Sequence, residues 1–406
     1  MRTAAALAAA CLLAACAYAP APQPATAPVI AAGWNAPATA GSAVTDRWWS
    51  QFDDALLQQM VDAALAASPG VSAAASRIEE ARAARTAAGA ALGPQVGANA
   101  SAVRGISDPI TPLATTTSAG LQASWEIDLF GAGRAGRNAA QARLEGTQAA
   151  WAGARTAVAA EAATSYIELR ACEAQLALTR IDSTSRSETS RLTELTAKAG
   201  FRAPSEAALA RASAAQGRTQ LAQLQGQCDL LVKSLVALTA IDEAALRQQL
   251  AARSGQLPQA APIAVASVPA ALLQQRPDLA NAARQVAAAA ADQDQRSAER
   301  WPQVSLSGSV GRMRIDSGGG NVSGTTWALG PLAVSLPLFD GGQRAANVQA
   351  ARAAYDDAVV QLQGSVRTAV REVEESLVRL QSTASRNDDA RLAADDFEAA
   401  LRATDS

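Results

Sequence analysis

The chain contains no histidine among its 406 residues. Histidine is the side chain most often used as a general base, as the partner of a catalytic nucleophile and as a metal ligand. Adjacent carboxylates do occur, at Glu79-Glu80 and Glu374-Glu375. Neighbouring residues on a helix point in different directions, so we interpret these pairs as solvated surface charges. The sequence therefore argues against an enzyme, and we predict no catalytic residue, no cofactor and no metal site.

Large apolar features and an excess of one charge are also missing. Aromatic residues make up only 4% of the chain, although apolar residues, many of them alanine, make up 49%. Alanine in bulk favours closely packed helices over a core of large side chains. Beyond residue 16, no uncharged apolar run reaches the roughly 18 residues of a transmembrane helix. The 35 basic and 37 acidic residues nearly balance, which excludes the basic surface expected of a nucleic-acid-binding protein.

Residues 1–16 have the pattern of an export signal. Arg2 supplies a positive charge, and the apolar residues 4–15 are too few to span a bilayer. Leu13-Ala14-Ala15-Cys16 is similar to the lipobox of bacterial lipoproteins, which implies cleavage before Cys16 and lipid attachment at its thiol and its new amine. The alternative is an ordinary secretory signal that ends in cysteine.

The residue after this motif indicates the destination. Ala17 stands where a signal for retention in the inner membrane would carry aspartate, so we expect delivery to the outer membrane. More than one acyl chain gives stable anchoring. We therefore assign residues 1–15 to a signal peptide and residues 16–45, rich in alanine and proline, to a lipid-anchored flexible tether.

The remainder of the chain contains an internal duplication. Pro69 and Pro94 bracket one predicted helix, and Pro277 and Pro302 bracket a second at the same separation. Matching residues at nearly one offset over such a distance indicate a repeated structure. Each repeat has the order helix, two strands, long helix. We place the first repeat at 46–240, a linker at 241–268 and the second repeat at 269–406.

Four segments alternate between apolar and polar residues. We predict strands at 95–104, 118–130, 302–313 and 326–339, with a bulge at Gly330-Pro331. Apolar residues on one face and polar residues on the other are typical of outer-membrane strands. A soluble antiparallel sheet with one buried face is the alternative, and Trp125 and Trp327 suit either. Four strands are too few to close a barrel, so the first interpretation requires several chains.

A helix of unusual length follows the first pair of strands. The alanine-rich segment 135–199 contains no proline, and about 65 helical residues extend roughly 100 Å. Gly200 marks its end, and residues 205–240 return antiparallel. Cys172 and Cys228 are equally far from Gly200, which places them level in the hairpin. We predict a disulfide between them, with two buried free thiols as the alternative.

Several motifs together resemble those of TolC-like outer-membrane factors of the NodT-type lipoprotein branch. They are the lipobox at Cys16, Trp48-Trp49 with Phe52 and Leu56, Trp125-Glu126-Ile127-Asp128-Leu129-Phe130-Gly131, Pro269 with Leu272-Leu273, Arg276-Pro277-Asp278, and Pro337-Leu338-Phe339-Asp340-Gly341-Gly342. The similarity covers nearly the whole chain after Cys16. It implies a mixed α and membrane-β fold, the outer membrane efflux protein fold.

The resemblance implies a homotrimer as well. Each protomer would give four strands to a twelve-stranded barrel in the outer membrane and its long antiparallel helices to a periplasmic α-barrel. The implied partners are a periplasmic membrane-fusion adaptor, an inner-membrane RND pump and outer-membrane lipid, with no nucleic acid. The implied function is a passive, gated conduit that exports small molecules from the periplasm. A channel for type I secretion and a lipid-anchored coiled-coil scaffold without a pore are the alternatives.

The resemblance also indicates where a gate would lie. Helix packing would change at the periplasmic tip, near Lys198, Gly200 and Arg202. Acidic residues often narrow the aperture in this family, and the candidates are Asp395, Asp396 and Asp405, each of which otherwise is a solvated helix charge. The return helix of the second repeat is absent, so we expect a truncated chain. A protomer without this helix would expose an apolar stripe, assemble poorly and leak or fail as a channel.

Overall fold

The computed structural model describes residues 47–106, 113–259 and 275–404. The chain divides into two compact units. The first is built on Ser76–Ala150 and Leu273–Val373, and the second on Ala31–Ala75, Trp151–Leu272 and Glu374–Ser406. Cys16, Asp405 and the tether assigned to 16–45 lie outside the described residues. The fold is mostly helical with one antiparallel sheet, which confirms the predicted fold class.

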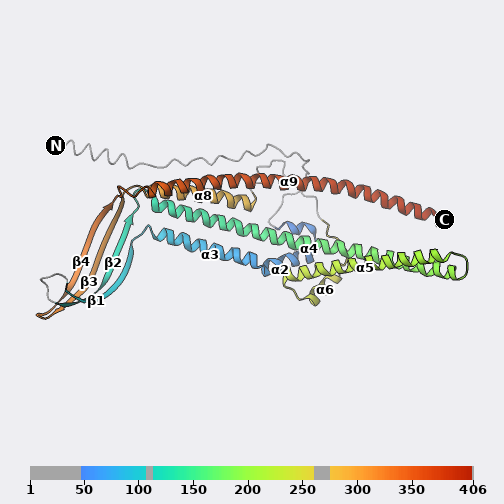
Figure 1. The fold of residues 1–406 in the computed structure, drawn as a ribbon, viewed down its shortest axis with the longest axis horizontal. Helices are drawn as coiled ribbons and strands as arrows, with labels where there is room; N and C mark the ends of the chain where they lie inside the picture. Colours follow the sequence, from blue (N-terminus) through green and yellow to red (C-terminus); the bar gives the residue numbers. More distant parts are fainter. Residues whose placement is uncertain (1–46, 107–112, 260–274, 405–406) are drawn as a thin grey trace. The chain divides into compact units, whose positions relative to one another are not determined.

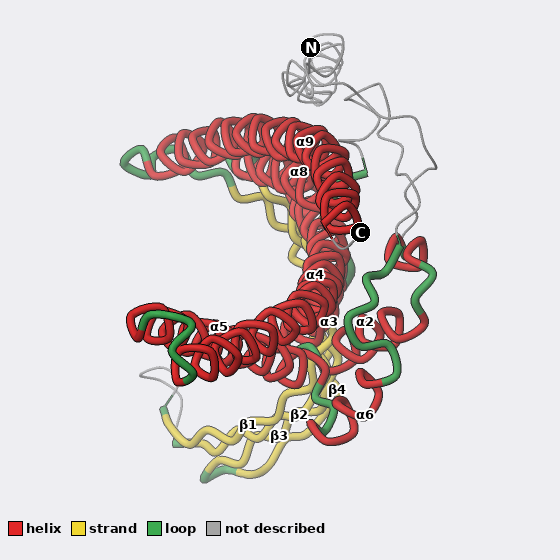
Figure 2. The backbone as a smooth tube through the Cα atoms, turned by 90° about the vertical axis from the view of Figure 1, so that its right-hand side faces the viewer, coloured by secondary structure: helices red, strands yellow, loops and turns green. Residues whose placement is uncertain are grey.

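Four antiparallel strands, yellow in Figure 2, form the sheet of the first unit. Their order in the sheet is β1-β2-β3-β4. Their bounds are β1 Gln95–Gly105, β2 Ala114–Ile127, β3 Gln303–Ser317 and β4 Gly320–Ser335. The central pair, β2 with β3, joins the two repeats along the sheet. Chain neighbours thus pair as hairpins, while the pairing of the repeats with each other depends on tertiary contacts.

Two details of register follow from the residues present. Leu306 pairs with Leu332 and Gly308 with Leu329, so one residue of β3 faces Gly330 and Pro331 of β4. This is the bulge that the phase change predicts. At the centre, a Cβ on Gly120 would lie 2.7 Å from the carbonyl oxygen of Val310, so glycine permits the close approach of β2 and β3.

The strand ends differ from the predicted ones for identifiable reasons. Residues 128–130 form a turn and not the end of β2, because the Asp128 carboxylate accepts hydrogen bonds from the backbone that starts the next helix. β4 stops before Pro337, which has no N–H to donate to a ladder. β2 and β4 also begin earlier than predicted, because their polar first residues continue the ladder toward the turns.

The helices of the first unit follow from their end residues. They are α8 (Pro277–Ala298) and parts of α3 (Pro69–Ala90), α4 (Ala132–Lys198) and α9 (Gln343–Thr404). α8 begins with proline at its first position and an aspartate in its first turn, which suits the helix dipole. Leu279 of α8 packs against Val366 and Ala369 of α9. Among the described residues, no helix has a run of side chains long and apolar enough to cross a bilayer.

A hydrophobic core holds the second unit together. The short 3-10 helix η1 (Trp48–Phe52) and α2 (Ala55–Ala67) pack against α4, α5 (Pro204–Thr239) and α6 (Glu243–Ala251). Fully buried members include Leu57, Met60, Leu235 and Leu246. The stretch 241–268, predicted as a linker, therefore contains a packed helix in its described part, because Leu246 and Leu250 bury one face of α6.

α4 and α5 run side by side as a hairpin (Figure 1). Gly200 has φ of +81°, the left-handed conformation that glycine adopts without strain. The Phe201 N–H donates to the carbonyl of Thr196 at 3.0 Å, and the Gly200 N–H donates to that of Ala197 at 3.0 Å. These two bonds define a Schellman motif, which ends α4 where the glycine predicts.

We expect Gly200→Ala to weaken this turn by about 1 kcal/mol, because alanine at positive φ is strained. No atom lies within 4 Å of a Cβ placed there, so the cost is conformational and not steric. Amide hydrogen exchange of Phe201 should speed about fivefold. Gly226→Ala, within α5 and equally open, is the control and should slow local exchange, since alanine favours the helix. If both variants changed the exchange rate in the same direction, the role of Gly200 in ending α4 would be contradicted.

Candidate functional site

The four strands place their apolar residues on one face. Side chains directly opposite each other in a ladder point to the same side of a sheet, so the register groups them into rows. These rows consist of Ile127, Val304 and Val334; Trp125, Leu306 and Leu332; Val96, Ala123, Gly308 and Leu329; and Ala98, Leu121, Val310 and Trp327. Trp327 and Leu329 are 77% and 80% exposed. An apolar surface of this extent is exposed in the single chain.

The opposite face of the sheet is polar or small near the helices, and toward the other end of the strands it carries one apolar row of Val103, Ile315 and Val322. Its rows include Gly97, Gln122, Ser309 and Ala328, and Ser101, Ser118, Met313 and Gly324. The hydroxyl groups of Ser101 and Ser118 are hydrogen-bonded at 2.9 Å. Glu126 lies on this face as well, next to Ser305 in the ladder. The sheet thus separates an apolar surface from one that suits water.

The motif Trp125 to Gly131 forms the junction between sheet and helix. The Trp125 indole Nε1 donates to the carbonyl of Leu92 at 2.9 Å. Asp128 accepts from the backbone N–H of Arg134 at 2.9 Å and pairs with its guanidinium at 3.1 Å. Gly131 has φ of +85°, which allows the chain to turn into α4. The motif residues therefore fix the angle at which α4 leaves β2.

A second contact supports the same junction from the other repeat. The Phe130 ring stacks on Trp301, which precedes β3, with centroids 5.7 Å apart and planes at 14°. In the second repeat Asp340 repeats the role of Asp128, since it accepts from the N–H of Gly342 at 2.9 Å and of Arg344 at 3.2 Å. The duplicated sequence thus builds the helix start twice with one device.

The motif Arg276-Pro277-Asp278 ties α8 to α9. Arg276 donates to both Asp278 oxygens, at 3.0 and 2.8 Å, and to Glu372 of α9 at 2.7 Å. The hydrogen bond from Arg276 lowers the pKa of Asp278, and the Asp278 carboxylate raises the pKa of Arg276 in turn. One guanidinium therefore holds the start of one helix against the middle of another.

The helical hairpin carries the cysteines. Cys172 of α4 and Cys228 of α5 are joined by a disulfide, with Cα atoms 5.7 Å apart. Leu224, Leu230 and Leu231 of α5 line an open groove beside it, of about 680 Å³. Further along the hairpin, Arg186 of α4 donates to the Ser213 hydroxyl of α5 at 3.1 Å. The two helices are thus linked both covalently and by polar contacts.

These features occur in a chain whose sequence matches a known family. The model of the family described as outer membrane efflux protein matches residues 60–242 and 268–406. The chain belongs to the outer membrane efflux protein family. The resemblance to TolC-like proteins of the NodT type is therefore confirmed. Outer membrane efflux proteins are channel proteins of the outer membrane that extend into the periplasm, which confirms the predicted location.

Individual relatives agree with the family. Nodulation protein T of Rhizobium leguminosarum bv. viciae is 29% identical over 364 residues, 90% of this chain and 75% of that protein. Outer membrane protein OprJ of Pseudomonas aeruginosa is 30% identical over 376 residues, 90% of this chain and 78% of OprJ. A crystal structure of a membrane protein from Pseudomonas aeruginosa has a TM-score of 0.75 at 28% identity, covering 87% of this chain and 81% of that one.

The gate candidates of this efflux protein occupy exposed positions. At the hairpin tip, Lys198 pairs with Glu194 at 3.5 Å, and Arg202 pairs with Glu206 at 3.2 Å. Asp395 and Asp396 are exposed on α9, and within the described ranges no ion pair joins them to the hairpin tip. The structure therefore groups the basic candidates and does not bring the acidic ones to them.

The sequence patterns did not indicate a buried arginine in the second unit. The Arg170 side chain is 0% exposed, and its Nη1 donates to Glu173 at 2.8 Å and to the carbonyl of Leu250 at 2.9 Å. Glu173 in turn accepts from the N–H of Gly255 at 2.9 Å. Burial lowers the pKa of Arg170, but Glu173 and Tyr166 raise it overall. α4 thereby fixes the end of α6.

Asp54 joins the N-terminal segment to the same helix. One carboxylate oxygen caps α2 by accepting from the N–H of Leu56 at 2.9 Å, and the other accepts from the Tyr166 hydroxyl at 3.1 Å. Burial raises the pKa of Tyr166. Arg253 lies 3.6 Å from Asp54. An Asp before an apolar helix is a sequence signal for the cap, but nothing in the pattern indicates the bond to Tyr166.

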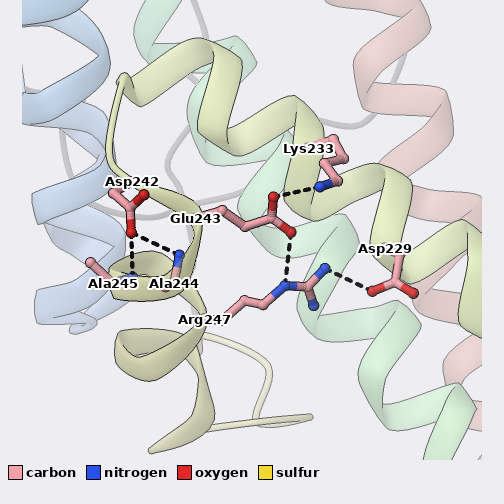
Figure 3. A network of polar contacts seen from close by, with 7 residues as sticks. All are labelled: Asp229, Lys233, Asp242, Glu243, Ala244, Ala245 and Arg247. Atoms are coloured by element: carbon pink, nitrogen blue, oxygen red, sulfur yellow. Dashed lines mark hydrogen bonds and ion pairs between the residues drawn. The ribbon is translucent and has the colours of Figure 1, made fainter.

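A surface network supports the connection between α5 and α6 (Figure 3). Arg247 donates to Asp229 at 2.9 Å and to Glu243 at 3.0 Å, and Lys233 also pairs with Glu243. Lys233 and then Arg247 lower the pKa of Glu243. Asp242 caps α6 through the N–H groups of Ala244 and Ala245. Such exposed pairs add little stability each, so the apolar face of α6 remains its main attachment.

Glu173→Gln should lower the free energy of unfolding by about 3 kcal/mol, because it leaves the buried Arg170 guanidinium without a counter-charge. Thermal unfolding of the detergent-solubilised protein measures this loss. Glu168→Gln, on the exposed side of the same helix, is the matched control and should change stability by less than about 0.5 kcal/mol. If both variants lost only a little free energy of unfolding, the ion pair between Arg170 and Glu173 would not stabilise the fold.

Two aspartates of α8 should respond to pH in opposite ways. The pKa of Asp278 is lowered, so its stabilisation exists above the ordinary value of 3.8 and is lost as the pH falls through the folded value. Burial raises the pKa of Asp294, so its contribution exists below 3.8 and is lost as the pH rises. At pH 7, Asp278→Asn should therefore destabilise and Asp294→Asn stabilise, each by less than about 1 kcal/mol.

Unfolding curves at pH 7 and near pH 3 test this pair. The Asp278→Asn effect should shrink as the pH falls below 3.8, since the unfolded chain then takes up a proton at Asp278 more readily than the folded one. If both variants changed the stability in the same direction at pH 7, the opposite pKa shifts of the two aspartates would be contradicted.

Proposed function

We propose that this chain is the outer-membrane channel subunit of a tripartite efflux system and exports small molecules from the periplasm. The observation that carries the proposal is the sheet, which exposes an apolar face and a polar face in a chain of the outer membrane efflux protein family. One face suits lipid and the other suits a water-filled lumen. Transport of this kind requires a path and a gate and no chemical step.

The edges of the sheet support an oligomer. β1 and β4 each pair on one side only among the described strands, so each leaves one row of backbone N–H and C=O groups without a strand partner. Such groups must be paired in lipid, and only a closed barrel pairs them all. Four strands cannot close, whereas three copies supply twelve. A homotrimer in which β1 of one copy pairs with β4 of the next satisfies this requirement.

The helices would form the periplasmic part. The disulfide between Cys172 and Cys228 is compatible with the oxidising periplasm. The hairpin tip at Lys198, Gly200 and Arg202 would meet a periplasmic adaptor, which links the channel to an inner-membrane RND pump. The pump supplies the energy, and rearranged helix packing near the tip opens the path, with Asp395 and Asp396 as acidic gate candidates.

Two neighbouring positions of β4 test which face meets lipid. Leu329→Arg puts a charge on the apolar face and should cost about 2–4 kcal/mol of insertion, so few channels form in planar bilayers. Ala328→Arg puts the same charge on the polar face, beside Ser309 and Gln122. This variant should insert normally and shift the ion selectivity of single channels toward anions.

Heat-modifiable migration on a gel reports assembly in the same preparations. Normal conductance of Leu329→Arg together with failed insertion of Ala328→Arg would reverse the two faces. The absence of heat-modifiable migration in the unmodified protein would instead favour a lipid-anchored scaffold.

A further inference from the structure

The charged residues of the strands are strongly segregated. The four strands contain five such residues, namely Arg104, Glu126, Arg312, Arg314 and Asp316. Glu126 lies on the polar face, and the other four share the face that carries the apolar rows. All four lie beyond the last apolar row, at one end of the sheet. The apolar face therefore ends abruptly in a charged border.

The register defines this border. After the row that contains Trp327, three more rows follow: Ala100, Ala119, Arg312 and Thr325; Ala102, Thr117, Arg314 and Ser323; and Arg104, Thr115, Asp316 and Asn321. We call Arg104, Arg312 and Arg314 the arginine belt. Apart from Asp316, the other residues of these three rows are small or carry hydroxyl and amide groups, which accept and donate hydrogen bonds.

The belt lies at the end of the sheet away from the helices. β1 joins β2, and β3 joins β4, beyond these rows, whereas α3, α8, α4 and α9 all connect at the opposite end (Figure 1). If the helices extend into the periplasm, as the proposed function requires, the belt faces the outer leaflet. This orientation, together with the contact of the apolar rows with lipid, rests on the proposed function.

The belt carries a net positive charge. Arg314 donates to both oxygens of Asp316, at 3.2 and 2.9 Å from Nε, which fixes its guanidinium. Within the described part of the chain, no ion pair involves Arg104 or Arg312, and both are exposed. Three cations thus face one carboxylate. A guanidinium is costly in hydrocarbon but favourable at the level of the headgroups, which the end of the apolar rows marks.

We propose that the arginine belt binds the phosphate groups of the phosphorylated glycolipid that forms the outer leaflet. The planar fork of arginine matches a phosphate with two parallel hydrogen bonds. Thr115, Thr117 and Ser323 supply hydroxyl donors beside it. Because the belt shares the face of the lipid-contacting rows, a lipid is its ligand and not a solute in the lumen.

Full-length protein reconstituted into nanodiscs tests this assignment. The probes are a diphosphorylated glycolipid and the same lipid without its phosphates, and the readout is the ratio of their affinities. Each arginine near a charged surface contributes about a factor of five, so the triple variant R104Q/R312Q/R314Q should lose the preference for phosphate about a hundredfold. R77Q/R218Q/R352Q, which removes three exposed helical arginines, should keep it.

The outcomes are distinct. An unchanged preference in the belt variant overturns the proposal, and so does displacement of the glycolipid by inorganic phosphate at equal phosphorus concentration, since the belt would then be a general anion site. The lysine variant R104K/R312K/R314K should retain part of the preference. Heat-modifiable migration of the same samples separates the two hypotheses: a heat-modifiable barrel without a phosphate preference rejects the belt alone, and the absence of a heat-modifiable species rejects the channel.

Discussion

The antiparallel ladder of β1 to β4 fixes which side chains share a face, and the rest of the membrane-facing structure depends on it. A shift of one residue in any strand would move its whole apolar set to the polar side. The bulge at Gly330 and Pro331 shows this constraint locally, because it restores the phase so that Leu332 continues the face of Leu329. The same register aligns Arg312 and Arg314 beyond the last apolar row.

The second unit is held by a different kind of contact. Its helices are rich in alanine, which allows close approach but buries little area per residue. A few larger groups therefore determine the packing: the core around Leu57 and Leu235, the disulfide at Cys172, and the buried guanidinium of Arg170. The polar atoms of Arg170 and Asp54 bind backbone groups of other segments, so they determine where α6 and α2 lie.

The duplication gives both halves one plan but not one set of contacts. Asp128 and Asp340 start the two long helices in the same way, and both halves order helix, strands and long helix alike. Arg276 has no such counterpart, because the residue before Pro69 is Ser68, which caps its own helix through the N–H of Val71 at 3.3 Å. The equivalent helices thus start differently: Arg276 ties the start of α8 to α9, whereas Ser68 only caps α3.

The sequence by itself determined the local features. Alternation predicted four strands, proline spacing predicted the repeated helices, and Gly200 with equidistant cysteines predicted the hairpin turn and the level of the disulfide. Each of these features depends on residues near one another in the sequence or placed symmetrically about a turn, so the sequence pattern alone indicates them. The exact strand ends needed the capping role of Asp128, which depends on a hydrogen bond to Arg134.

Only the tertiary structure decided the contacts between distant segments. The bonds from Tyr166 to Asp54, Arg170 to Leu250 and Arg276 to Glu372 span 112, 80 and 96 residues. The pairing of β2 with β3, which aligns the arginine belt with the apolar rows, joins residues of different repeats. No periodicity encodes such partners, because they depend on the path of the folded chain and on which buried polar groups still need a hydrogen bond.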